Sequence, residues 1–181
     1  LGHHVEMVKV PINIEEMTEH YLIYYGFLAY AVSHWGTLVV NAKVDHGQLE
    51  PFTIGLSNKF KANALKLPGS IRKLRKVGTD TEKLFDKYDV LMNPVVAHST
   101  PPIGYFSTKL SADEITKRAV EFATYCGLQN ITGSPAISLP LGVDSNNMPM
   151  GVQFSAPIGN EKRLLELAYE LELARPWRML Q

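Results

Sequence analysis

One helical pattern constrains the first third of the chain. Apolar residues recur there at the spacings of three and four that mark one face of an α-helix. They are Ile14, Met17, Tyr21, Tyr24, Leu28, Ala31 and Trp35. Asn13 and Glu16 resemble a capping box, in which each side chain bonds a backbone amide of the first helical turn. Since other faces of this segment are also apolar, we expect a long helix that is covered on most sides.

The middle of the chain has the composition of further helices. Residues 52–67 are predicted to form a helix that ends at Pro68 and Gly69. A short helix then starts at Ser70, with Ile71, Leu74 and Val77 on one face. Thr79 and Glu82 form a second capping box, which predicts one more helix start.

The remaining pattern predicts short strands. The valine-rich residues 4–10, before Pro11, are typical of a strand, and so are residues 88–92. Pro135 and Pro140 bracket a third strand, and a turn at residues 144–149 leads to a fourth at 150–155.

Two more helices complete the prediction, from Ser111 to about Tyr125 and from Asn160 onward. Helices that alternate with about four strands indicate the α/β class, with a mixed sheet flanked by helices. No repeat or linker divides the chain, so we expect a single domain over residues 1–181.

Composition excludes several classes of protein. The 18 Lys and Arg residues balance 18 Asp and Glu residues, whereas a nucleic-acid-binding protein normally carries a basic surplus. The longest nearly apolar run, residues 21–32, is shorter than the roughly 20 residues that span a bilayer. A single cysteine, Cys126, cannot form an internal disulfide, which predicts a cytoplasmic protein.

Two side-chain pairs have catalytic or metal-binding alternatives. Glu16 and His20 lie one helical turn apart, but two ligands do not make a zinc site, so an exposed helix face is the preferred interpretation. Ser70 and Lys73 match the S-x-x-K pattern of serine hydrolases that use a lysine base. The companion motifs are missing, and Ser70 also fits a helix N-cap.

Single residues offer weaker signals. Cys126 could be a nucleophile, but it follows Phe122, Ala123 and Tyr125 and is more simply a small buried residue. Asp89 is interpreted as a turn or cap residue. The residues alone therefore do not define an active site, and no metal site is predicted.

Several motifs in order resemble the second half of an amidase signature enzyme. The most specific stretch is Asn-Ile-Thr-Gly-Ser-Pro-Ala-Ile-Ser-Leu-Pro-Leu-Gly at residues 130–142, followed by Met-Pro-Met-Gly-Val-Gln-Phe at 148–154. Residues 1–6, 88–98, 164–168 and 176–177 also resemble this family. The resemblance spans the chain and is weakest over residues 40–80.

The resemblance implies amide hydrolysis by a Ser–cis-Ser–Lys triad, without a cofactor. In the family, these residues and the oxyanion-binding amides lie upstream of the segment that this chain resembles. The chain has no Gly-Gly-Ser-Ser-Gly-like run. No catalytic residue is therefore carried over, and the chain is expected to be inactive alone.

The resemblance instead implies that this chain contributes one wall of a substrate pocket. The resemblance places Tyr125, Cys126 and Gln129 near a small-molecule amide substrate. Family members that amidate glutamate on tRNA hold the substrate amino group with an acidic residue in the preceding helix. Because Ala123 stands at that position, the resemblance disfavours glutamine-dependent amidation of tRNA. The apolar, aromatic surroundings suit a less polar amide.

Two hypotheses follow for the whole chain. The first is the C-terminal part of an amidase, with Leu1 and Gly2 as a cut end. The alternative is a non-catalytic binding or assembly module built on the same half-fold. Unpaired strand edges and apolar helix faces would then favour a homo-oligomer.

Overall fold

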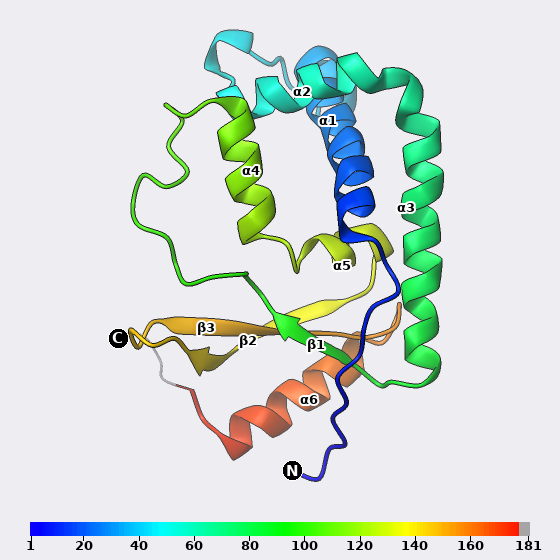
Figure 1. The fold of residues 1–181 in the computed structure, drawn as a ribbon, viewed down its shortest axis with the longest axis vertical. Coiled ribbons are helices and arrows are strands. Elements are labelled where there is room, and N and C mark those ends of the chain that lie inside the picture. Colours follow the sequence, from blue (N-terminus) through cyan, green and yellow to red (C-terminus); the bar gives the residue numbers. More distant parts are fainter. Residues whose placement is uncertain (178–181) are drawn as a thin grey trace. The chain divides into compact units, whose positions relative to one another are not determined.

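A computed structural model describes residues 1–177 of the chain (Figure 1). The helices are α1 (Ile14–Val39), α2 (Pro51–Asn63), α3 (Leu67–Glu82), α4 (Ala112–Phe122), α5 (Gly127–Thr132) and α6 (Glu161–Ala174). The strands are β1 (Leu91–Pro94), β2 (Ala136–Val143) and β3 (Pro149–Ser155).

The described residues form two compact units. The helical unit contains Ile12–Val77 and Pro101–Phe122. The sheet unit contains Leu1–Pro11, Gly78–Thr100 and the residues from Ala123 onward. The division falls inside α3, between Val77 and Gly78.

The sheet unit is built on an antiparallel sheet with the strand order β1-β3-β2. Ser155 of β3 pairs with Leu91 on one side and Ala136 on the other. The turn between β2 and β3 is held by Asp144, whose Oδ1 accepts hydrogen bonds from the amides of Asn146 (2.8 Å) and Met148 (2.9 Å). This Asx-type turn fixes the register of the hairpin.

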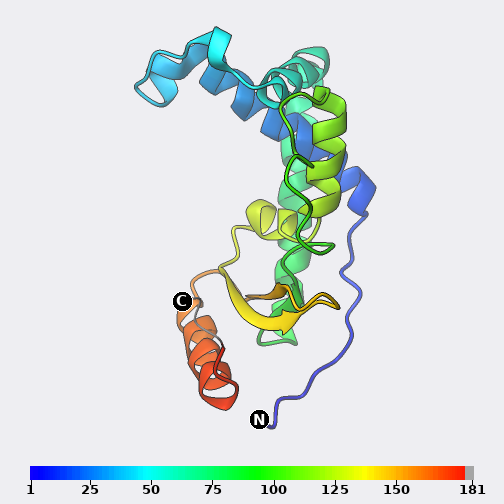
Figure 2. The same ribbon diagram turned by 90° about the vertical axis from the view of Figure 1, so that its left-hand side faces the viewer.

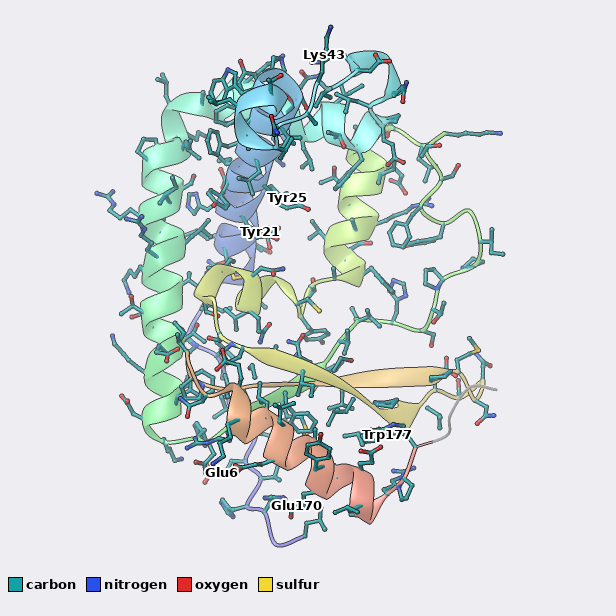
Figure 3. The ribbon with its side chains drawn as sticks, turned by 180° about the vertical axis from the view of Figure 1, so that it is seen from behind. Glu6, Tyr21, Tyr25, Lys43, Glu170 and Trp177 are labelled. Atoms are coloured by element: carbon teal, nitrogen blue, oxygen red, sulfur yellow. The ribbon has the colours of Figure 1, made fainter. Side chains whose placement is uncertain are left out.

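An apolar core lies between the sheet and α6. Leu139 of β2, Phe154 of β3 and Leu164 of α6 are buried together with Ala156. Both Figure 1 and Figure 2 show α6 lying along one face of the strands, and Figure 3 shows Trp177 beside the same layer. Since side chains alternate along a strand, the other face of β3 carries Gln153 and Ser155.

Close backbone approach organises the helical unit. A Cβ atom added at Gly26 of α1 would lie 2.5 Å from the carbonyl oxygen of Leu56 in α2. The same contact brings the ring of Phe60 to 5.4 Å from Phe27 and 5.3 Å from Tyr30, measured between centroids. Glycine at this position therefore allows α1 and α2 to pack with aromatic rings between them.

The structure confirms the long first helix but not its predicted surroundings. Met17, Ile23 and Ala31 are buried. Ile14, Leu28 and Trp35, which belong to the predicted stripe, are exposed. The prediction that the helix is covered on most sides is therefore wrong.

The predicted break at Pro68 and Gly69 is also wrong. Both residues lie in the first turn of α3, where proline is tolerated because its missing amide would have no helical partner. Ser70 is consequently a helix residue and not an N-cap. Thr79 starts no new helix, and Glu82 Oε1 instead accepts a hydrogen bond from the Ile158 amide (3.3 Å).

Residues 4–10 do not form the predicted strand. The segment is irregular, and its fixed point is Glu6, whose carboxylate accepts hydrogen bonds from Lys87 Nζ (2.7 Å) and the Tyr88 hydroxyl (2.9 Å). The bond from the Lys87 ammonium, with that from Tyr88, lowers the pKa of Glu6 to about 2. This segment is thus attached by polar contacts and not by a strand ladder.

The predictions of the fold class and of the start of α4 agree with the structure. The α/β class with helices flanking a sheet is confirmed, although the described strands are three and all antiparallel, whereas a mixed sheet of about four was expected. Ser111 caps α4 as predicted, accepting from the Glu114 amide at 3.2 Å, but α4 ends at Phe122 and the short α5 follows. None of the helices within residues 1–177 combines the length and the hydropathy of a membrane-spanning segment.

We expect Gly26→Ala to lower the free energy of unfolding by about 1–3 kcal/mol, because the new methyl group would overlap a backbone oxygen. Gly69→Ala is the matched control, since a Cβ there meets nothing within 4 Å. It should raise stability by about 0.5–1 kcal/mol through helix propensity. Urea unfolding followed by circular dichroism measures both changes, and equal effects would contradict the close approach.

Candidate functional site

The polar face of the sheet is covered by α5 and the residues just before it (Figure 1). Gln129 of α5 donates a hydrogen bond from Nε2 to Ser155 Oγ, at 3.3 Å. Ser155 is fully buried, with 1% of its surface exposed. The arrangement follows from the alternation in β3, which turns Ser155 away from the apolar core and towards α5.

Cys126 belongs to the same cluster. Its Sγ lies 3.0 Å from the Val95 carbonyl oxygen and 3.5 Å from Gln153 Oε1, both of which accept from the thiol. Burial raises the pKa of the Cys126 thiol above its ordinary value, because the thiolate would lose hydration. The thiol is therefore a packed hydrogen-bond donor and a poor nucleophile.

Two polar atoms of this cluster have no hydrogen-bond partner within residues 1–177. They are Gln129 Oε1, an acceptor, and Gln153 Nε2, a donor, and both are buried. The other end of each side-chain amide is already bonded, to Ser155 and Cys126 respectively. The cluster thus offers one acceptor and one donor to a further polar group. We call Cys126, Gln129, Gln153 and Ser155 the amide cluster.

Comparisons with known proteins identify the family. The family model described as Amidase matches residues 2–165. A Mycobacterium leprae protein named as amidase AmiC is 40% identical over the whole chain, which covers 38% of that relative. The chain belongs to the amidase family.

Solved structures agree on the fold. The structure of a 6-aminohexanoate cyclic dimer hydrolase complexed with substrate superposes with a TM-score of 0.81 at 22% identity, covering 97% of this chain and 38% of that chain. A bacterial aryl acylamidase of the amidase signature family gives a TM-score of 0.63 at 16% identity, covering 96% and 37%. This chain therefore has part of the amidase fold and spans less than half the length of these relatives.

Of the three pocket residues implied by the family resemblance, the structure brings two together. Cys126 and Gln129 lie in the amide cluster. Tyr125 is 40% exposed, and no described contact joins it to the cluster. Ala123 is exposed and precedes α5 in a turn.

Two residues of the cluster were missed from the sequence. Gln153 lies in the family-like run at residues 148–154 and Ser155 directly follows it, but neither is among the predicted pocket residues. The signal that could have found them is the alternation Val152-Gln153-Phe154-Ser155, in which polar residues share one strand face.

The structure separates Ser70 from Lys73. Ser70 is completely buried, and its Oγ is hydrogen-bonded to His20 Nδ1 at 3.0 Å. Lys73 is exposed and forms an ion pair with Glu16. The S-x-x-K hydrolase alternative therefore fails, because the serine is inaccessible and the lysine is engaged elsewhere.

Glu16, His20 and Ser70 form a chain of contacts that resembles an acid–base–serine triad. Glu16 Oε1 lies 3.8 Å from His20 Nε2. The hydrogen bond from Lys73 lowers the pKa of the Glu16 carboxyl, so this carboxylate is shared between His20 and Lys73. With no surface on Ser70 for a substrate to reach, the contacts join α1 to α3 and do not form a nucleophilic site. The predicted exposed face is correct for Glu16 and wrong for His20.

The remaining candidates are structural. Asp89 is exposed and pairs with Arg163 Nη1 at 3.0 Å, which links the start of β1 to α6. Within the described part of the chain, no group of three His, Cys, Asp or Glu residues is placed to hold a metal ion.

We expect Cys126 to react slowly with iodoacetamide at neutral pH, since the reactive species is the thiolate and burial disfavours it. The rate should rise as the pH is raised, and it should rise at least about tenfold when urea unfolds the chain. Mass spectrometry of this single cysteine gives the rate. Native alkylation as fast as that of the unfolded chain would contradict the partly buried, hydrogen-bonded thiol.

Proposed function

We propose that this chain forms one wall of the substrate site of an amide hydrolase, with the catalytic serines and lysine supplied from outside its 181 residues. The observation that carries the proposal is the free acceptor on Gln129 and the free donor on Gln153. Membership of the amidase family and relatives named as amidases support the reaction class.

The chemistry of the amide cluster suits an amide ligand. A carboxamide presents one carbonyl acceptor and, when not fully substituted, one N–H donor. Gln153 Nε2 can donate to the carbonyl oxygen, and Gln129 Oε1 can accept from the N–H group. Since a buried polar atom without a partner costs about 1–3 kcal/mol, a ligand that satisfies both atoms is favoured over an apolar one.

The proposed reaction adds water across the carbon–nitrogen bond and yields a carboxylic acid and ammonia or an amine. In the Ser–Ser–Lys mechanism implied by the family, the outer serine attacks the carbonyl carbon and the lysine moves the proton through the middle serine. The residues of this chain would orient the amide and exclude water, and they would not form the covalent bond.

The expected substrate is an amide with little charge. Tyr125, exposed beside the cluster in sequence, offers an apolar surface, and Ala123 offers no carboxylate for an amino group. One relative, from Paenarthrobacter ureafaciens, is named 6-aminohexanoate-cyclic-dimer hydrolase and is 36% identical over 96 residues, half of this chain. The balanced formal charge favours a small substrate over tRNA.

We also infer a cytoplasmic location, because the single cysteine is a free thiol and contributes no disulfide.

We expect the purified 181-residue chain to release no ammonia or amine from benzamide or from 6-aminohexanoate cyclic dimer, because it lacks a competent nucleophile. A colorimetric amine assay measures the release. Turnover by the parent chain that disappears in Ser70→Ala or Cys126→Ala would overturn this expectation. It would also overturn the proposal that the catalytic residues lie outside these 181 residues.

The role of the cluster is tested by restoring activity. The chain is co-expressed with the part of the Mycobacterium leprae relative that it does not cover, and hydrolysis is measured with and without Gln129→Ala. We expect this change to raise KM about tenfold with little change in kcat, as lost substrate binding would. Gln48→Ala, an exposed glutamine in the helical unit, is the matched control.

A second candidate function is assembly, which the exposed face of α1 favours. From Tyr25 onward, the exposed apolar side chains there are spaced by three and four, as in a coiled-coil seam. The exposed members are Ile14, Tyr25, Leu28, Val32, Trp35 and Val39. Figure 3 labels Tyr21 and Tyr25, whose rings stack one turn apart along this helix. We propose that the stripe packs against the same stripe of a second copy, since a two-fold axis brings the same surface of two copies together.

We expect Leu28→Glu to lower the mass measured by light scattering after size exclusion from that of a dimer to that of a monomer. Leu173→Glu, which changes an exposed leucine of α6, should leave the mass unchanged. A monomeric parent chain, or equal effects of the two changes, would reject the α1 interface.

A further inference from the structure

A pocket lies in the helical unit between the end of α1, residues 46–49 and α2, with a volume of about 180 Å³. It is smaller than the roughly 300–1,000 Å³ of pockets for drug-sized ligands. It is made by residues of one compact unit only, and it is separate from the amide cluster, which belongs to the sheet unit. Its occupant must therefore be small.

Part of the lining is polar, and Lys61, whose Nζ lies 5.5 Å from the centroid of the Tyr30 ring, gives it a positive charge. Lys61 and Asn58 line the pocket from α2, together with Ser57. Ser57 is 4% exposed, and its Oγ is buried without a hydrogen-bond partner among residues 1–177. A buried hydroxyl that is left unpaired costs about 1–3 kcal/mol, so a ligand acceptor at this point is favoured.

Two histidines extend the polar lining. The His34 ring stacks on Tyr30, with centroids 4.0 Å apart, and its Nδ1 lies 3.1 Å from the Tyr30 carbonyl oxygen. The His46 ring meets His34 edge-on at 5.3 Å. Among residues 1–177, no Asp or Glu lines the pocket. The nearby Asp45 carboxylate accepts hydrogen bonds from the Gly47 amide (2.9 Å) and Gln48 Nε2 (3.1 Å). The lining therefore favours an anion.

Of the three remaining lining residues, two are apolar, and the third, Ser33, donates its hydroxyl to the Ala29 carbonyl oxygen. Leu49 and Ile54 face the same space as the donors. An inorganic anion such as phosphate has no apolar surface to bury against these two side chains. A short alkyl chain would cover them and remove their apolar surface from water. The combination of one ammonium, an unpaired hydroxyl and an apolar wall therefore favours an anion with an alkyl chain over an inorganic anion.

We propose that this pocket binds a small monocarboxylate with a short alkyl chain. The carboxylate lies at Lys61, Ser57 and Asn58, and the alkyl chain lies against Leu49 and Ile54. The site does not depend on amide hydrolysis, because no residue of the amide cluster takes part in it.

The test uses sodium butyrate as the probe, at constant ionic strength, with the backbone amide signals of Ser57 and Asn58 followed by NMR. Binding should saturate below about 50 mM, since a ligand of so few atoms reaches only millimolar affinity. Butyramide has the same shape without the charge, and phosphate has charge without the alkyl chain. Both should bind at least about fivefold more weakly.

Two variants locate the site. Lys61→Met should weaken butyrate binding about tenfold, whereas Lys59→Met, an exposed lysine of α2 outside the pocket, should not. Ser57→Ala should weaken binding about fivefold and keep or raise the melting temperature, because it removes an unpaired buried hydroxyl. Absence of saturation in the folded chain, equal binding of butyramide or phosphate, or equal loss in both lysine variants would overturn the proposal.

Discussion

The sheet unit depends on the alternation of apolar and polar side chains along β3. Phe154 turns to one face and packs with Leu139 and Leu164 beneath α6. Gln153 and Ser155 turn to the other face and are buried there under α5. A shift of one residue in register would bring the two polar side chains into the apolar core, at a cost of several kcal/mol. One strand therefore fixes both the core and the polar site.

The position of Gln129 depends on how α5 ends. Gly133 adopts a left-handed backbone conformation, with φ of 73°, and its amide bonds the Gln129 carbonyl oxygen at 2.9 Å. The chain can then turn at once into β2, where the Ala156 amide bonds the Pro135 carbonyl oxygen at 3.1 Å. A residue with a Cβ atom would be strained at Gly133. The Gly-Ser-Pro sequence between α5 and β2 thus holds the helix over the polar face.

The sequence predicts what local spacing determines. The long helix from Ile14, the cap at Ser111 and the turn at Asp144 each rest on contacts within a few residues, and all three are found. The prediction at Pro68 was wrong because proline can either end a helix or occupy its first turn. In the first turn, the missing amide hydrogen would have no helical partner. Residues 4–10 misled because strand propensity is not enough without a partner strand.

The amide cluster could be predicted only in part. The family resemblance directs attention to Cys126 and Gln129, which are close in sequence. Gln153 and Ser155 join them through strand pairing and the packing of α5, which are long-range contacts with no signature at one position. The alternation along β3 marks these residues as sharing a face, but it does not say which helix covers that face.

The sheet unit contains several buried polar atoms that have no hydrogen-bond partner among residues 1–177. Thr81, Gln129, Ser134 and Gln153 all carry such atoms within the described residues. Each such atom lowers the free energy of unfolding by about 1–3 kcal/mol. Their combined cost is comparable with the roughly 5–15 kcal/mol by which a typical domain is stable. Because the chain spans only 38% of its Mycobacterium leprae relative, partners for these atoms can come from the rest of such a protein or from its substrate. Under the proposed function, an amide substrate would satisfy two of these atoms, Gln129 Oε1 and Gln153 Nε2.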